Sequence, residues 1–160
     1  MVERIIKRKV NRKLIINLVL PVTLIIFILF TKWWIVNVVD GTDGIMYGFP
    51  FIYKAPAFYT SMAQEYFILE LIADLIIYFV VIFGMVYLIN KFLFAITIRR
   101  VLSVILFVVA SLLISLELLI AFMPENKFSL KRKDDIEIKQ TGFKFPLNNS
   151  DEMEFDNYHK

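Results

Sequence analysis

Four charged residues lie within long apolar stretches of this 160-residue chain, and they are its first candidates for chemistry. They are Lys32, Glu70, Asp74 and Glu117. A charge at the centre of a membrane helix costs about 2.5–3.5 kcal/mol on insertion scales, so such residues usually face protein or water. At about 1.5 Å per helical residue, all four fall within roughly 6–12 Å of the outer ends of their stretches. The spacing therefore predicts one intramembrane polar cluster.

The expected cluster pairs Lys32 with Glu70 and brings Asp74 close to Glu117. Glu70 and Asp74 are four residues apart and share a helix face, which Tyr78 continues with a hydroxyl within reach of Asp74. Two carboxylates in a low dielectric cannot both ionise cheaply, so one would hold a proton. This arrangement could serve a proton or cation path, or a contact with a basic partner helix. In the alternative, Lys32 and Glu70 extend to the headgroups, while Asp74 and Glu117 hold helices together.

Two further pairs have structural interpretations. Pro21 lacks an amide hydrogen, so it frees the carbonyl of Asn17 and predicts a helix kink. Trp33 and Trp34 have the amphipathic rings typical of the aromatic belt at a membrane interface.

Several classes of function are disfavoured by composition. The chain has no cysteine, and its single histidine is His159, so the commonest metal ligands are missing from its body. We expect no cofactor and no metal. The basic excess is concentrated in residues 1–13 rather than in a stripe of bases and aromatics, so nucleic-acid binding is not expected.

The elements that must position these residues are predicted to be membrane helices. Hydrophobic residues make up 59% of the chain, and the mean hydropathy is +0.68. They fall in three blocks long enough to span a bilayer, at 14–36, 65–90 and 101–123. Backbone groups in lipid must pair within the segment, so each block should be helical. The predicted fold class is an all-α integral membrane protein. The first block is too long for a usual signal peptide and is interpreted as an uncleaved anchor.

The orientation follows from lysine and arginine counts in the short connections. Residues 1–13 and 91–100 are the basic segments and are placed in the cytoplasm. The loop 37–64 and the tail 124–160 are then extracytoplasmic. We therefore expect a multi-pass protein of the plasma (inner) membrane, with a cytoplasmic N-terminus and an extracytoplasmic C-terminus.

The connecting segments leave alternatives open. The apolar residues 92–98 either lie along the inner interface or extend the third helix. The loop 37–64 is rich in aromatic residues and is either an interaction site or packed at the membrane interface. The tail 124–160 is expected to be mostly irregular, although apolar and polar residues alternate around Thr141 and Gly142, which favours a short β-hairpin.

The leading functional hypothesis is a non-catalytic accessory, assembly or immunity-type subunit that acts by protein–protein contact in the membrane. Its partners would be the bilayer and another membrane protein or further copies of itself. The pair Ser111 and Ser115 lets helices approach closely but is a weak pattern. The alternative is a small ion-linked transporter or channel component that uses Asp74 and Glu117. No catalytic signature was found, so an enzyme is not expected.

Overall fold

The computed structural model describes residues 12–38, 44–57, 63–133 and 135–144. These residues divide into two compact units. The helical unit comprises residues 1–28 and 75–116, and the sheet unit comprises residues 29–74 and 117–160. Most of the predicted basic N-terminus and the last part of the tail lie outside the described residues.

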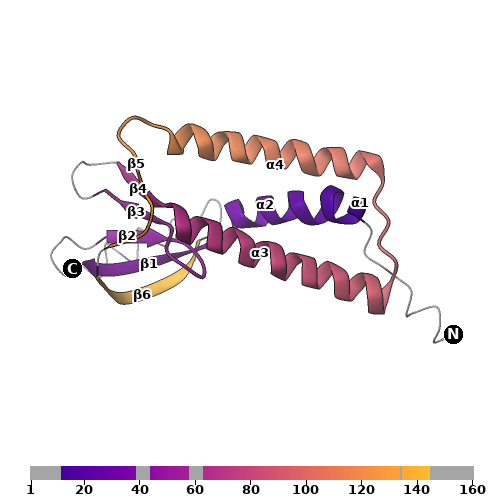
Figure 1. Cartoon of the computed structure of the whole chain (residues 1–160), viewed down its shortest axis with the longest axis horizontal. Coiled ribbons are helices and arrows are strands. Elements are labelled where there is room, and N and C mark those ends of the chain that lie inside the picture. Colours follow the sequence, from indigo (N-terminus) through magenta and orange to yellow (C-terminus); the bar gives the residue numbers. More distant parts are fainter. Residues whose placement is uncertain (1–11, 39–43, 58–62, 134, 145–160) are drawn as a thin grey trace. The chain divides into compact units, whose positions relative to one another are not determined.

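The helices follow the apolar blocks of the sequence (Figure 1). Two of them contain a π-helical turn, at which the helical hydrogen bonds are spaced more widely. Three helical stretches are long and apolar enough to cross a membrane: Arg12–Leu29, Ile68–Leu93 and Arg100–Ala121. Their elements in chain order are α1 (Arg12–Leu14), a π-helical turn (Ile15–Val19), α2 (Leu20–Leu29), α3 (Ile68–Leu88), a second π-helical turn (Ile89–Leu93) and α4 (Arg100–Ala121).

The predicted kink residues lie at the first π-helical turn. Pro21 follows this turn, and the carbonyl of Asn17 accepts a hydrogen bond from Ser103 Oγ of α4 at 3.4 Å. Pro21 has no N–H to donate to the Asn17 carbonyl, and this carbonyl accepts a hydrogen bond from another helix instead.

The segment after α3 is not a helical extension of α4. Residues 94–99 have no regular secondary structure, and α4 begins only at Arg100. The Asn90 side chain accepts a hydrogen bond from the Ile96 backbone N–H at 3.0 Å, which closes the chain back on the end of α3.

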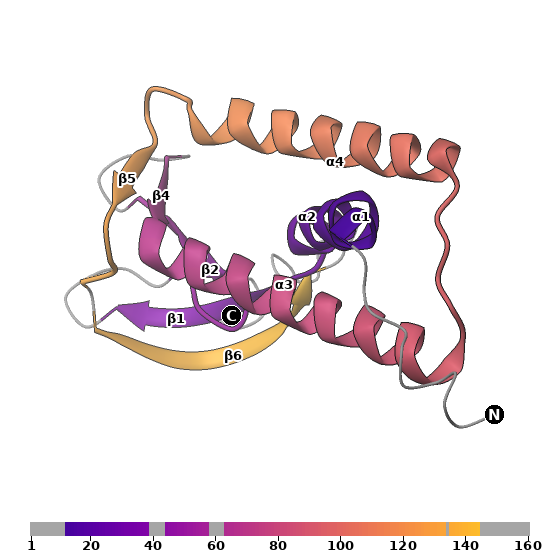
Figure 2. The same ribbon diagram turned by 45° about the vertical axis from the view of Figure 1, so that its right-hand side comes forward.

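The sheet unit contains six strands in the order β5-β4-β3-β2-β1-β6, and all of them are labelled in Figure 1. Figure 2 shows β1 and β6 side by side from a second direction. Neighbouring strands are antiparallel except β4 and β5, which are parallel. The strands are β1 (Thr31–Val38), β2 (Gly44–Tyr47), β3 (Lys54–Pro56), β4 (Gln64–Phe67), β5 (Lys127–Ser129) and β6 (Ile136–Lys144).

The prediction of an all-α fold is therefore wrong. The first helix ends at Leu29, and residues 31–36, which were assigned to its outer end, lie in the strand β1 (Thr31–Val38). Thr141 and Gly142 lie inside β6, a single strand paired with β1, instead of forming a hairpin turn. The physical reason is that β-branched and aromatic side chains pack well on a pleated, half-buried surface. Pairing with neighbouring strands gives the backbone N–H and C=O groups hydrogen-bond partners without a helix.

One face of the sheet carries a hydrophobic core. Its buried members come from β1 to β4 and the loop before β3, and Trp34 and Ile136 pack against them. Alternate residues of β1 contribute, as expected for a strand with one face in the core. The buried residues are Val36, Val38, Met46, Ile52, Ala55 and Phe67.

The other face carries a row of directly paired residues that crosses all six strands. Trp33 is buried, and a Cβ atom on its neighbour Gly142 would lie 2.3 Å from the Trp33 ring. The indole therefore lies directly on the β6 backbone. The row from β6 to β5 is Gly142, Trp33, Tyr47, Lys54, Tyr66 and Phe128.

Candidate functional site

Asp74 holds the turn Gly48–Phe51, which we call the 48–51 turn. It lies in the second turn of α3, and its side chain is 0% exposed. Its Oδ2 accepts the Phe49 N–H at 3.0 Å, and its Oδ1 accepts the Phe51 N–H at 2.9 Å. Pro50, between them, has no N–H to donate. One carboxylate therefore satisfies both amide donors of the Phe49–Phe51 segment.

Gly48 fixes the other side of the 48–51 turn. Its φ of +147° is strained for any residue with a side chain, and a Cβ there would lie 2.0 Å from the Phe51 carbonyl oxygen. The Gly48 N–H donates to the Lys32 carbonyl at 3.0 Å, and the Gly48 carbonyl accepts from Trp34 Nε1 at 2.8 Å. The next peptide bond, Phe49–Pro50, is cis.

The Lys32 ammonium lies among three aromatic rings. Its Nζ is 4.9 Å from the centre of Trp34, 5.2 Å from Phe49 and 5.1 Å from Phe143. Phe30 stacks on Phe143 with 5.1 Å between ring centres. A cation over an aromatic face is stabilised by the ring quadrupole. Between the residues that the structure describes, no ion pair joins Lys32 to an acid.

Glu70 is bound to the segment that follows β5. Its Oε1 accepts the Arg132 backbone N–H at 3.3 Å. Its Oε2 is buried and has no hydrogen-bond partner among the described residues.

Glu117 acts on a second group of residues, which the sequence did not indicate. Lys54 Nζ lies 5.4 Å from the centre of the Tyr66 ring, and the Glu117 charge is close enough to influence both. Burial lowers the pKa of Lys54; Glu117 opposes that change, and Lys144 adds to it. Burial, with a contribution from Glu117, raises the pKa of Tyr66 to about 12. Pairing of β3 with β4 brings Lys54 and Tyr66 together, and no sequence motif could have revealed it.

The structure thus brings together part of the expected cluster. Lys32 and Asp74 meet at the 48–51 turn through the ring and the N–H of Phe49. Glu70 and Glu117 have other partners. The remaining candidate, Tyr78, packs edge-on against Phe27 with 5.5 Å between ring centres.

The two candidate belt residues lie in β1. Trp33 is buried on Gly142, and the indole of Trp34 donates to Gly48. Both side chains therefore have packing roles within the sheet unit.

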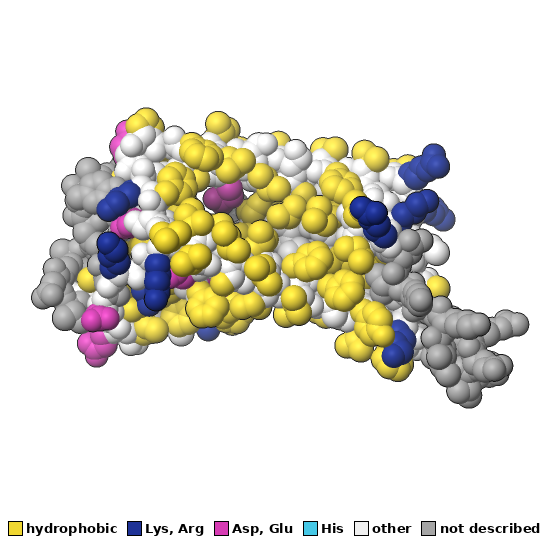
Figure 3. Space-filling view, in the orientation of Figure 1, with side chains coloured by type: hydrophobic (Ala, Val, Ile, Leu, Met, Phe, Trp, Pro, Cys, Tyr) yellow, Lys and Arg dark blue, Asp and Glu magenta, His cyan; other side chains and the backbone are white. Residues whose placement is uncertain are grey.

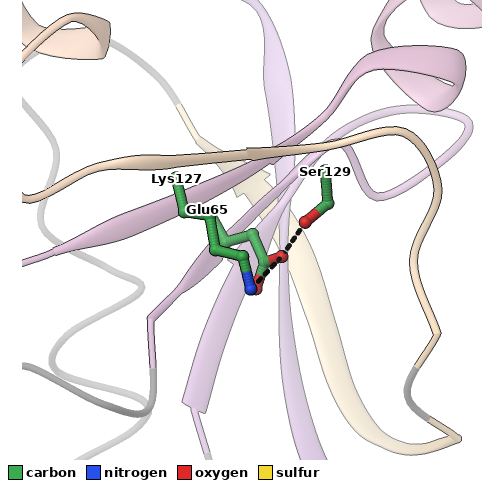
Figure 4. Close-up of polar contacts among 3 residues, drawn as sticks. All are labelled: Glu65, Lys127 and Ser129. Carbon is green, nitrogen blue, oxygen red and sulfur yellow. Dashed lines mark hydrogen bonds and ion pairs between the residues drawn. The ribbon is translucent and has the colours of Figure 1, made fainter.

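Three polar side chains join β4 to β5 at the parallel edge of the sheet (Figure 4). The Glu65 carboxylate accepts a hydrogen bond from Ser129 Oγ and lies 3.9 Å from Lys127 Nζ. These contacts attach a strand that follows α4 to the strand that precedes α3.

Comparisons with models of known families, with curated proteins and with solved structures find no match. In the part of the chain that the structure describes, the fold combines three apolar helices with a six-stranded mixed sheet. Its function has to be inferred from its own residues.

Proposed function

We propose that this chain is a non-catalytic multi-pass membrane protein that acts by protein–protein contact within the membrane. The observation that carries the proposal is the exposed surface of α4. Only 6% of the most apolar stretch of α4 is buried, against 22% for Arg12–Leu29 and 17% for Ile68–Leu93. Hydrophobic side chains cover the visible surface of the helices (Figure 3).

The exposed side of α4 has the composition of a helix-packing surface. Ser103 and Ala110 are its buried residues and lie seven positions apart on one side. Val108 and Leu112 are exposed on the opposite side, and Ser111 and Ser115 are exposed in the adjoining row, between that side and the buried one. Two small residues four positions apart let another backbone approach closely, which favours a partner helix over lipid alone.

The Ser115 hydroxyl does not need a polar partner on that side. Its Oγ donates to the Ser111 carbonyl within the helix at 2.8 Å. Close van der Waals packing would therefore be the main attraction at this surface.

The contacts of the acids give less support to ion-linked transport. Both oxygens of Asp74 already accept backbone hydrogen bonds, and Glu117 lies near Lys54 and Tyr66. A carboxylate that carries a moving ion or proton needs a free oxygen facing a path. We therefore propose binding and not conduction.

The test is purification of the full chain from its native membrane in mild detergent, with co-purifying proteins measured by quantitative mass spectrometry. We expect a stoichiometric membrane-protein partner, whose yield falls at least tenfold in the double variant Ser111→Leu, Ser115→Leu. The control is Val109→Leu, which enlarges a side chain on another side of α4, and it should keep the partner. Recovery of the wild-type chain alone, or equal partner yields in the double variant and the control, would contradict the proposal.

A further inference from the structure

One face of the sheet brings together two lysines and two tyrosines from four strands. Lys54 of β3 pairs directly with Tyr47 of β2 and with Tyr66 of β4, so these three side chains share a face. Lys144 of β6 reaches the same group, because its Nζ lies 3.4 Å from the Tyr47 hydroxyl and 4.5 Å from the centre of that ring. We call these four residues the lysine–tyrosine cluster.

Tyr66 contributes a buried hydroxyl to the cluster. The residue is 5% exposed, and its ring stacks on Phe128 with 5.5 Å between ring centres. Among the residues that the structure describes, the Tyr66 hydroxyl has no hydrogen-bond partner. A buried polar group left unpaired is unfavourable, so it indicates a partner from outside the chain. The pKa of Tyr66 is raised to about 12, so the hydroxyl keeps its proton at neutral pH and can donate a hydrogen bond.

Lys54 contributes a positive charge that no acid neutralises directly. Its Nζ lies 5.4 Å from the centre of the Tyr66 ring, and within the described part of the chain no acid forms an ion pair with it. Lys54 is only half-buried, so a ligand can reach its ammonium from outside. The charge of Lys144 adds to the lowering of the Lys54 pKa, because the two ammonium groups repel each other. An anion close to both would be attracted by each of them.

The charge and the donors of the cluster suit a phosphate group. Its two ammonium groups have one carboxylate near them that acts on both Lys54 and Tyr66, that of Glu117, so the excess charge is positive. Lys54 Nζ and the Tyr66 hydroxyl both donate hydrogen bonds. Lysine binds phosphate as a point charge, and a phosphate group has more acceptor oxygens than the two of a carboxylate. It can therefore accept hydrogen bonds from donors on different strands at once.

We propose that the lysine–tyrosine cluster is a binding site for a phosphate group, with Lys54 and Tyr66 as its direct ligands and Lys144 as a further positive charge. The inference goes beyond the proposed function and does not depend on it, because all of these residues belong to the sheet unit. Free inorganic phosphate and the headgroup of a phospholipid both supply this chemistry, and the test separates the two sources.

The test is isothermal titration calorimetry of the purified full-length chain in a mild non-ionic detergent, at neutral pH and constant ionic strength. One probe is inorganic phosphate, and the other is glycerophosphoglycerol, the water-soluble headgroup of phosphatidylglycerol. Lys54→Met keeps the alkyl stem and removes the charge, whereas Tyr66→Phe keeps the stacked ring and removes the hydroxyl. Lys127→Met is the matched control, because it makes the same substitution on β5 of the same sheet.

We expect saturable binding of at least one probe. Its affinity should fall by about tenfold in Lys54→Met and by about threefold in Tyr66→Phe, since a charged hydrogen bond contributes more than a neutral one. Lys127→Met should stay within about twofold of the wild type, because it removes no ligand of the site. Tighter binding of inorganic phosphate would identify the free anion as the ligand, and tighter binding of glycerophosphoglycerol would identify the lipid headgroup.

Tyr66→Phe also separates binding from folding, because the hydroxyl has no partner to lose among the described residues. Without ligand, this variant should unfold at the temperature of the wild type or above it, although it binds the probe more weakly. A structural role of the hydroxyl would lower the unfolding temperature instead. The inference is overturned if the wild type binds neither probe saturably, or if Tyr66→Phe and Lys127→Met bind the probe with equal affinity.

Discussion

Asp74 can be accommodated in an apolar helix without a cation because its charge is stabilised by backbone N–H groups. Hydrogen bonds to a charged acceptor are stronger than neutral ones, and here two converge on one side chain. The sequence marks Asp74 only as a charge in an apolar stretch and suggests a side-chain partner, whereas its partners in the structure are backbone N–H groups. Backbone N–H groups are present in almost every residue, so they leave no signal in a sequence.

Substitution of Asp74 should therefore lower stability in a graded way. Asp74→Asn keeps one acceptor oxygen, whereas Asp74→Ala removes both and leaves the part-buried N–H groups of Phe49 and Phe51 without their acceptor. Each unpaired N–H costs on the order of 1–3 kcal/mol, so alanine should destabilise the protein more than asparagine does. Thermal unfolding of the purified protein in detergent would measure the difference. Equal stability of the wild type and the alanine variant would show that the carboxylate does not hold the turn.

At the scale of elements, the apolar helices were predictable and the sheet was not. Length and hydropathy are enough to place helices near 14–29, 68–93 and 100–121. The strand β1 was missed because Thr31–Val38 continues the apolar character of the first helix with no proline or glycine between them. Its tryptophan, isoleucine and valine residues have high strand propensity, and this composition was the one feature of the segment that could have indicated a strand. The pairing of β1 with β6 joins residues about a hundred positions apart and depends on tertiary structure.

The two glycines of β6 and α3 should respond oppositely to the same substitution. Gly142→Ala places a methyl group against the buried Trp33 ring, at a cost of about 1–3 kcal/mol for overpacking. Gly84 has no atom within 4 Å of a built Cβ, so Gly84→Ala should stabilise α3 by up to about 1 kcal/mol. The midpoints of thermal unfolding in one detergent provide the comparison. A neutral Gly142→Ala would mean that Trp33 does not lie on β6.

At the scale of the whole molecule, the sheet constrains the topology more firmly than charge counting does. The strands β1 to β4 come from the segment between the first two apolar helices, and β5 and β6 come from the segment after the third. Because these strands share one sheet, the proposed membrane arrangement requires both segments to lie on the same side of the bilayer. The lysines and arginines just after α4 would by themselves favour a cytoplasmic tail.

Cysteine labelling of intact cells can test this arrangement. In separate variants, Asp43→Cys and Glu137→Cys should both react with a membrane-impermeant maleimide, whereas Thr97→Cys should react only after permeabilisation. The first two variants should share one behaviour even if the orientation is reversed. Opposite behaviour of the sites at 43 and 137 would be incompatible with the six-stranded sheet.

The strand order also has a consequence for biogenesis. Both outer strands of the sheet, β5 and β6, are synthesised after α4, while the four strands between them are made before α3. The nascent chain would therefore carry a sheet with two unpaired edges until its last helix has been inserted, and such edges promote aggregation. In the proposed membrane arrangement, the sheet is therefore completed only after the third helix has crossed the bilayer.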